Sequence, residues 1–287
     1  MPRHTLIQVT DLHLSAERAC NYAGWAACRD HINRTRPDLV VATGDLVLCN
    51  PDHEADHDFV AAELASIKVP WAALPGNHDI GDTGPRPYMG QWITEARRQR
   101  FLDRLGPDWW ARDLGPWRIL GLNAQLIGSG LVAEAEQLAF INAELALAGA
   151  RPLAVFLHKP LFVDHPAEAG DPVWCVLRPG RDGIWQRLTR ANLRLVACGH
   201  AHHYRTLVID GVSMVWAPST ALVIDDKVAP FEGLHAPGLV SYAFEDDRVE
   251  FGLVKPSGLV TSDLTDLVAR YGAMRNAPVL RLADVLD

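Results

Sequence analysis

Five short and almost entirely apolar runs place the strongest constraint on what this chain can fold into. They occupy residues 5–10, 39–43, 69–74, 153–157 and 193–198. Runs of this kind are typical of strands that are buried on both faces of a sheet. Stretches with helical character lie between several of them, at residues 22–36, 54–67 and 133–148. Alternating strands and helices predict right-handed crossovers and a mainly parallel sheet.

The pattern changes in the last third of the chain, where turn residues separate short segments. The spacing predicts antiparallel strands joined as hairpins, over residues 204–209, 212–217, 239–245 and 248–254. We expect these strands to form a second sheet that stacks on the first.

No linker in the sequence is strong enough to divide the chain into two domains. We expect one domain over residues 1–258, followed by a C-terminal extension over residues 259–287 that packs on the domain or trails it. Residues 259–272 can form a helix within this extension.

Composition excludes several classes of protein. The chain has 287 residues, of which 48% are hydrophobic and 22% are charged, close to the average of globular proteins. Its formal net charge of −8 opposes binding to the phosphate backbone, so a nucleic-acid partner is not expected. Its five cysteines are scattered and form no Cys-x-x-Cys pair, which indicates free thiols.

No apolar run approaches the roughly 18 residues that a membrane-spanning helix requires. The first residues lead directly into a strand-like segment, without the pattern of a secretory signal. We therefore expect a cytoplasmic protein with no membrane partner.

Residues that can bind a metal or move a proton follow each of the five apolar runs. They are Asp11 and His13, Asp45, Asn77 and His78, His158, and His200 and His202. Ligands of open α/β sheets bind outside the carboxyl ends of the strands, so these side chains should converge in one crevice. A glycine precedes three of them, at Gly44, Gly76 and Gly199, and lets the backbone turn sharply and approach a ligand closely.

The types of donor atom indicate which metals such a crevice would bind. Carboxylates, one amide oxygen and neutral imidazoles suit Mn, Fe, Zn or Co. The donors are too many for one ion, whereas two ions sharing a bridging carboxylate would use them all.

The motifs also carry a resemblance to a known family. Asp11-Leu-His13, Gly44-Asp45, Gly76-Asn77-His78-Asp79, His158 and Gly199-His200-Ala-His202 resemble, in order, the five blocks of the calcineurin-like metallophosphoesterase superfamily. Their spacing, with Pro218-Ser-Thr220 after the last block, is most similar to bacterial class III cyclic-nucleotide and glycerophosphodiester phosphodiesterases. The resemblance implies a four-layer α/β/β/α sandwich of two stacked mixed sheets flanked by helices.

The resemblance also implies roles for these residues. It divides the metal donors into Asp11, His13 and His202 for one ion, Asn77, His158 and His200 for the other, and Asp45 as the bridge. His78 would face a phosphoryl oxygen or the leaving group, oriented by Asp79. Leu48 stands where purple acid phosphatases have a ligand tyrosine, so a tyrosinate-bound ferric ion is not expected.

These roles lead to a hypothesis about the reaction. A hydroxide that bridges the two ions would attack a small phosphodiester in line, while His78 stabilises the phosphoryl oxygen or protonates the leaving alkoxide. Two alternatives stay open: a phosphomonoesterase with the same site, and a metal-binding scaffold without activity. A homodimer is also left open.

For several of the other histidines and for the two long loops, the sequence allows both a functional and a structural interpretation. His53 and His57 have the spacing of a helical metal pair, but we favour a solvated helix start. Loops 79–91 and 159–182 are either binding loops or surface insertions, and His165 and His235 can contact a substrate from segments near the site.

The remaining candidates are basic and aromatic side chains. They can steer an anionic substrate toward the site or stack on it. Alternatively, they only pack against the protein or form a solvated surface. The basic candidates are Arg97, Arg98, Arg100, Lys159, Arg178 and Arg181, and the aromatic ones on loops are Tyr88 and Trp174. Trp109, Trp110 and Trp117 are expected to pack in an edge or hairpin region.

Overall fold

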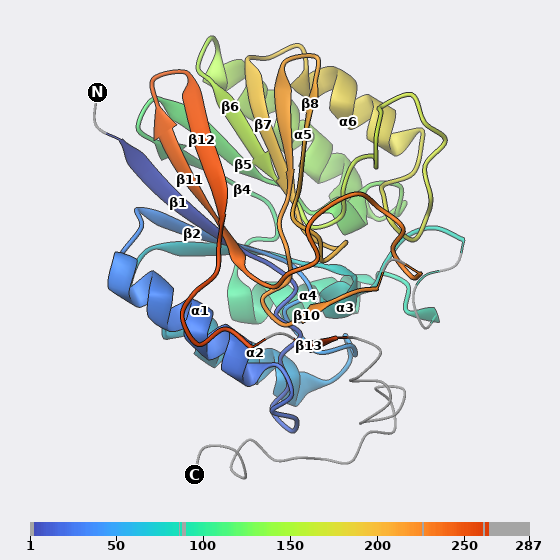
Figure 1. Ribbon diagram of the computed structural model, residues 1–287. Coiled ribbons are helices and arrows are strands. Elements are labelled where there is room, and N and C mark those ends of the chain that lie inside the picture. The colour runs from blue at the N-terminus through green and yellow to red at the C-terminus, as the bar shows by residue number, and fades with distance from the viewer. Residues whose placement is uncertain (1–2, 86, 88–89, 226, 261, 264–287) are drawn as a thin grey trace.

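The computed structural model describes residues 3–85, 87, 90–225, 227–260 and 262–263. Over these residues two sheets stack face to face, and helices cover both outer faces (Figure 1). The expected four-layer α/β/β/α sandwich is therefore confirmed.

The first sheet has the strand order β12-β11-β1-β2-β3. Strands β1, β2 and β3 are parallel, and the hairpin β11–β12 joins β1 in antiparallel orientation. The bounds of its strands are β1 (His4–Val9), β2 (Leu39–Thr43), β3 (Trp71–Leu74), β11 (Leu239–Glu245) and β12 (Arg248–Val254).

The second sheet has the order β4-β5-β6-β7-β9-β8. Its four inner strands are parallel, and antiparallel edge strands close it at both ends. Its strands are β4 (Trp110–Leu114), β5 (Trp117–Gly121), β6 (Leu153–Phe156), β7 (Leu193–Cys198), β8 (Arg205–Ile209) and β9 (Val212–Trp216). A separate short pair joins β10 (Leu222–Val223) to β13 (Ser262–Asp263).

Helices connect the parallel strands. They are α1 (Tyr22–Thr35), α2 (Glu54–Ala65), α3 (Asn77–Ile80), α4 (Glu95–Leu105), η2 (Ala124–Leu126), α5 (Val132–Ala148) and α6 (Gly180–Leu188). Helix α1 ends at Thr35, and the next residue, Arg36, has a left-handed backbone and precedes Pro37, a residue that cannot continue a helix.

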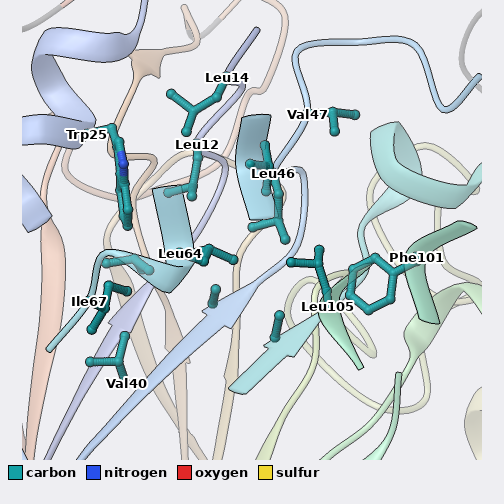
Figure 2. Close-up of a cluster of buried hydrophobic side chains, with 14 of the residues drawn as sticks. Leu12, Leu14, Trp25, Val40, Leu46, Val47, Leu64, Ile67, Phe101 and Leu105 are labelled. Carbon is teal, nitrogen blue, oxygen red and sulfur yellow. The ribbon is translucent and has the colours of Figure 1, made fainter. Parts of the chain in front are cut away.

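Three apolar layers hold the sandwich together, because successive side chains of a strand point to opposite faces of its sheet. In β2, Val41 packs between the two sheets, whereas Val40 faces the outer layer with α1, α2 and α4. Figure 2 shows Val40 in this outer layer, together with Trp25, Leu64, Phe101 and Leu105. This pattern explains why the strands are continuous apolar runs, since each strand is covered on both faces.

The prediction that the hairpin strands after residue 204 form the second sheet is wrong. The hairpins after residue 204 do not build a sheet of their own: β8–β9 extends one sheet and β11–β12 extends the other. The apolar runs themselves divide into two groups, with β1, β2 and β3 in the first sheet and β6 and β7 in the second. Edge positions were available in both sheets, and a hairpin can add to either one.

The solvated helix start predicted around His57 is also wrong. The His57 ring is fully buried and its Nε2 lies 3.1 Å from the Pro51 carbonyl oxygen. Asp56 beside it is buried too and accepts the Ala16 amide at 2.8 Å. Each of these two polar side chains can face inward because a main-chain group of a neighbouring loop hydrogen-bonds to it.

The predictions for the C-terminal residues and for membrane-spanning helices can be compared with the described residues. The helix expected over residues 259–272 lies mostly outside the described residues, although Ser262–Asp263 forms strand β13. The division into residues 1–258 and 259–287 stays a prediction. Within the described part of the chain, no helix combines the length and apolar character needed to cross a bilayer.

Candidate metal centre and active site

The predicted metal donors converge at the carboxyl ends of the parallel strands of both sheets. One group combines Asp11 and His13, which follow β1, with His202, which follows β7. The Nε2 atom of His202 lies 3.2 Å from Asp11 Oδ1 and 3.2 Å from His13 Nε2. All three side chains are buried.

A second group lies around His158, which follows β6. Its Nε2 atom is 3.3 Å from Asp45 Oδ2, 3.1 Å from His200 Nδ1 and 3.2 Å from Asn77 Oδ1. In each group of three His or Asp residues, the donor atoms lie within 4.8 Å of one another. The structure therefore contains two candidate metal-ligand groups.

The histidines present lone pairs to these groups. Each bonds a main-chain carbonyl through its other ring nitrogen, and a carbonyl can only accept, so that nitrogen carries the proton. The acceptors are Leu48 for His13, Thr43 for His158, Val173 for His200 and Leu222 for His202. Second partners of this type orient metal-bound histidines in general.

Unpaired donor atoms show that the two groups fit cations. His13 Nε2 lies 3.2 Å from His202 Nε2, and His158 Nε2 lies 3.1 Å from His200 Nδ1. Asp11 Oδ1 is buried and has no hydrogen-bond partner among the described residues. Buried acceptors without donors cost free energy, and a cation between them would remove that cost.

The pKa values of most of these side chains favour metal binding. Burial, together with His78, lowers the pKa of His13 to about 4, and burial with His158 lowers the pKa of His200 to about 3. Both rings are therefore neutral at pH 7, as metal ligands must be. For His158, burial lowers the pKa but Asp45 outweighs it and raises the value to about 9, so a cation binding there would displace a proton.

The donor loops have an unusual backbone. Five of the predicted donors have a positive φ, namely Asp11 (52°), His13 (46°), Asp45 (50°), His200 (71°) and His202 (59°). This conformation costs about 1–3 kcal/mol for a non-glycine residue and is concentrated at functional sites in proteins. Hydrogen bonds between the loops offset it: Asp11 Oδ2 accepts the His200 amide at 2.9 Å and Asp45 Oδ1 accepts the His78 amide at 2.8 Å.

The three glycines before the donors are needed for space between these loops. A Cβ atom on Gly76 would lie 2.2 Å from Asp45 Oδ1, and one on Gly199 would lie 2.0 Å from Thr10 Oγ1. Gly44 also has a φ of +89°, and its Cβ atom would lie 2.6 Å from the Gly76 amide nitrogen. The close approach that the sequence predicted is thus an approach of the donor loops to one another.

The predicted catalytic residues lie beside the donors. His78 Nε2 is 3.7 Å from Asp45 Oδ2, and its ring packs edge-on against His13 with 5.0 Å between ring centroids. Asp79 accepts three main-chain amides, from Leu46 at 2.9 Å, Val47 at 3.0 Å and Gly76 at 2.7 Å. Asp79 therefore fixes the loops that carry Asp45 and Asn77, and its orientation of the His78 ring stays a prediction.

A pocket of about 360 Å³ opens over the two groups. Its floor contains His13, Asp45, Asn77, His78, His200 and His202. Its wall is apolar, with Leu48, Cys49, Val173, Trp174, Leu222, Ile224 and Val228, and Asp82 is its remaining residue. None of these described lining residues is an arginine or lysine.

Both long loops contribute to this pocket, Asp82 from the first and Val173 and Trp174 from the second. Trp174 is placed where the sequence suggested stacking, whereas Tyr88 lies outside the described residues. Asp82 and the wall residues Leu222, Ile224 and Val228 were missed. They lie in irregular segments or short strands without a motif, and only the fold brings them to the site.

None of the basic candidates is among the described lining residues of this pocket, and each has a structural partner. Arg97 and Arg100 pair with Asp52, Arg98 pairs with Asp108, and Arg178 pairs with Asp182. Arg181 is buried against carbonyl oxygens of its own loop, and Lys159 is buried against Asp82.

The histidines outside the donor groups also have structural partners. His235 Nδ1 lies 2.8 Å from His203 Nε2, and His165 Nδ1 accepts the Ala167 amide at 3.1 Å. Neither His165 nor His235 is among the described pocket residues.

A family model described as calcineurin-like phosphoesterase matches residues 4–204, which include every predicted donor. The chain belongs to the calcineurin-like phosphoesterase family. Members of this family are metal-dependent phosphoesterases with a dinuclear centre, in agreement with the two donor groups described above.

Named relatives of this calcineurin-like phosphoesterase are similar over most of its length. It is 28% identical over 251 residues to a probable cyclic nucleotide phosphodiesterase of Psychrobacter arcticus, which covers 79% of this chain and 82% of the relative. It is 26% identical over 268 residues to the glycerophosphodiester phosphodiesterase GpdQ of Enterobacter lignolyticus. This match covers 89% of this chain and 85% of the relative.

Among solved structures, a dimetal phosphatase from Danio rerio has the same fold. The TM-score is 0.59 at 17% identity, over 87% of this chain and 95% of that one.

Proposed function

We propose that this calcineurin-like phosphoesterase hydrolyses a small, monoanionic phosphodiester. The observation that carries the proposal is the pocket itself, in which two donor groups form the floor and no described lining residue is an arginine or lysine. A phosphomonoester carries close to two negative charges at neutral pH, since its second pKa is about 6. A diester carries one charge, which two bound cations can neutralise without help from basic side chains.

In this proposal the metal donors are divided as the family resemblance implies. Asp11, His13 and His202 would hold one ion, Asn77, His158 and His200 would hold the other, and Asp45 would contribute to both. Mn, Fe, Zn and Co all suit these oxygen and imidazole donors. Bound ions of this kind activate water, orient the ester and neutralise charge on the attacking and leaving oxygens.

The chain's own residues would position and protonate the substrate. His78 lines the pocket beside Asp45, from where its ring would donate a hydrogen bond to a phosphoryl oxygen or a proton to the leaving alkoxide. Asp79 would keep Asp45 and Asn77 in place through its three main-chain hydrogen bonds.

The apolar wall favours a substrate with a large, flat substituent. Trp174 and its aliphatic neighbours offer a surface for stacking and apolar contact, and they offer few partners to the hydroxyl groups of glycerol. A cyclic nucleotide is therefore our first candidate, in line with the name of the Psychrobacter relative. A glycerophosphodiester, named for the Enterobacter relative, is the second.

The experiment is a substrate panel with metal-loaded protein and its His78→Ala variant. We expect bis(p-nitrophenyl) phosphate and 3',5'-cyclic AMP to be hydrolysed faster than p-nitrophenyl phosphate. The variant should keep its bound metal and lose turnover by about 10²–10⁴-fold, the usual contribution of a general acid.

Two other results would contradict the proposal. A preference for the monoester would indicate a phosphomonoesterase, and the absence of turnover in fully metal-loaded protein would indicate a scaffold. If His78→Ala lost metal as well as activity, the role given to His78 would be wrong. A small-molecule partner, the cytoplasmic location and a homodimer stay predictions.

A further inference from the structure

Lys159 directly follows the donor His158, but its side chain does not enter the pocket. It is 3% exposed, and its ammonium group donates to Asp82 Oδ2 at 2.8 Å and to the Pro172 carbonyl oxygen at 2.7 Å. These two acceptors belong to the two long loops that flank the pocket. One cation therefore joins both loops to the end of β6.

The Asp82 end of this connection is itself firmly held. Asp82 is buried, and its other oxygen, Oδ1, accepts Gln125 Nε2 at 2.9 Å and the Thr83 amide at 2.8 Å. Asp82 also lines the pocket. The carboxylate of Asp82 is thus held in place, and the ammonium group of Lys159 links it to the Pro172 carbonyl oxygen.

The Pro172 end leads directly to the pocket wall and to a metal donor. Val173 and Trp174 follow Pro172 and form part of the wall. The Val173 carbonyl oxygen accepts His200 Nε2 at 2.7 Å, and the Trp174 ring centroid is 5.8 Å from that of His200. The segment held by Lys159 therefore holds the Nε2 edge of the His200 ring.

A buried ammonium group is costly unless a carboxylate and further acceptors surround it, and apolar side chains in place of both partners of a buried ion pair often give equal or greater stability. The charge is therefore not needed for packing. What it adds is a directional connection between two loops whose described residues share no regular secondary structure.

We propose that Lys159 is a positioning residue that fixes the Val173–Trp174 wall against His200 and so sets which substituents the pocket accepts. The proposal rests on the phosphodiesterase activity proposed above only for its kinetic test. Its structural test needs no turnover.

The kinetic test compares two diesters that share a leaving group, bis(p-nitrophenyl) phosphate and methyl p-nitrophenyl phosphate. We expect Trp174→Ala to change the ratio of their kcat/KM values by about fivefold or more, and Lys159→Met to change it in the same direction, mainly through KM. In the double variant the two effects should not add, because both act on one wall. Lys159→Arg, which keeps the cation, should restore most of the ratio.

The structural test is hydrogen–deuterium exchange of the amides of residues 173–176, measured in all variants. Exchange should be faster in Lys159→Met and in Asp82→Asn than in the wild type, because the loop loses its anchor. The matched control is Arg181→Met, which removes another buried cation of the same loop, bonded to the carbonyl oxygens of Leu161, Pro166 and Glu168. The control should leave the substrate ratio unchanged.

Full additivity of the Lys159 and Trp174 effects, or unchanged exchange at residues 173–176, would overturn the proposal. If Lys159→Met does not fold, Asp82→Asn gives the same two readouts. If the wild type hydrolyses neither diester, the proposed function fails, and the exchange experiment still decides the role of Lys159.

Discussion

Gly199 lies at the closest contact of the site, where the loop after β7 meets the loop after β1. A Cβ atom there would be 2.0 Å from Thr10 Oγ1 and 2.7 Å from Asp11 Oδ2. The same Asp11 oxygen accepts the Thr10 hydroxyl at 2.7 Å and the His200 amide at 2.9 Å. One added methyl group would therefore push apart donors that belong to different sheets.

We predict that Gly199→Ala destabilises the protein by about 1–3 kcal/mol, as overpacking of a filled interior does, and weakens metal binding. Denaturant unfolding and metal analysis of the same sample check both effects. Gly252→Ala is the control, because nothing lies within 4 Å of a Cβ atom at Gly252. Equal unfolding free energies for the two variants would show that the loops have more freedom than the structure indicates.

At the scale of elements, the segment from Pro51 to helix α2 depends on a buried, neutral histidine. His57 bonds the Pro51 carbonyl oxygen, and burial lowers its pKa from 6.5 to about 4. The unfolded chain therefore binds a proton at His57 between pH 6.5 and pH 4, and the folded chain does not. The stability that neutral His57 provides is complete above pH 6.5 and is lost as the pH falls toward 4.

We predict that the wild type loses about 2 kcal/mol more unfolding free energy than His57→Gln between pH 7.5 and pH 4.5, because the glutamine cannot be protonated. Glutamine can still donate to the Pro51 carbonyl. Urea unfolding of metal-free protein at both pH values measures the difference. Parallel pH profiles for the two proteins would mean that His57 titrates normally in the folded state.

The elements also show which parts of the fold can be predicted from sequence. The apolar runs and the donors that follow them are local patterns, so Asp11, Asp45 and His158 could be placed at strand ends without a structure. The sheet that each hairpin joins could not, because an apolar segment such as 239–245 can pair with the edge of either sheet. The burial of His57 and Lys159 depends on carbonyl oxygens of Pro51 and Pro172, and no local pattern indicates that those atoms are close.

At the scale of the whole molecule, the site lies on the seam between the two sheets. Asp11, His13, Asp45 and Asn77 follow strands of the first sheet, whereas His158, His200 and His202 follow strands of the second. Each candidate metal group contains donors from both sheets. Metal binding and the stacking of the sheets are therefore coupled, because ions that bind only the folded chain stabilise it.

We propose that these donors would hold a pair of ions, with Asp45 contributing to both. The most direct test is the number of Mn²⁺ ions bound per chain at saturation, determined by equilibrium dialysis and elemental analysis. The wild type and the control Asp210→Asn, an exposed aspartate that also has a positive φ (51°), should each bind two ions, and Asp45→Asn should bind fewer. A wild type that binds one ion or none, or an Asp45→Asn variant that still binds two with unchanged affinity, would contradict a two-ion centre to which Asp45 contributes twice.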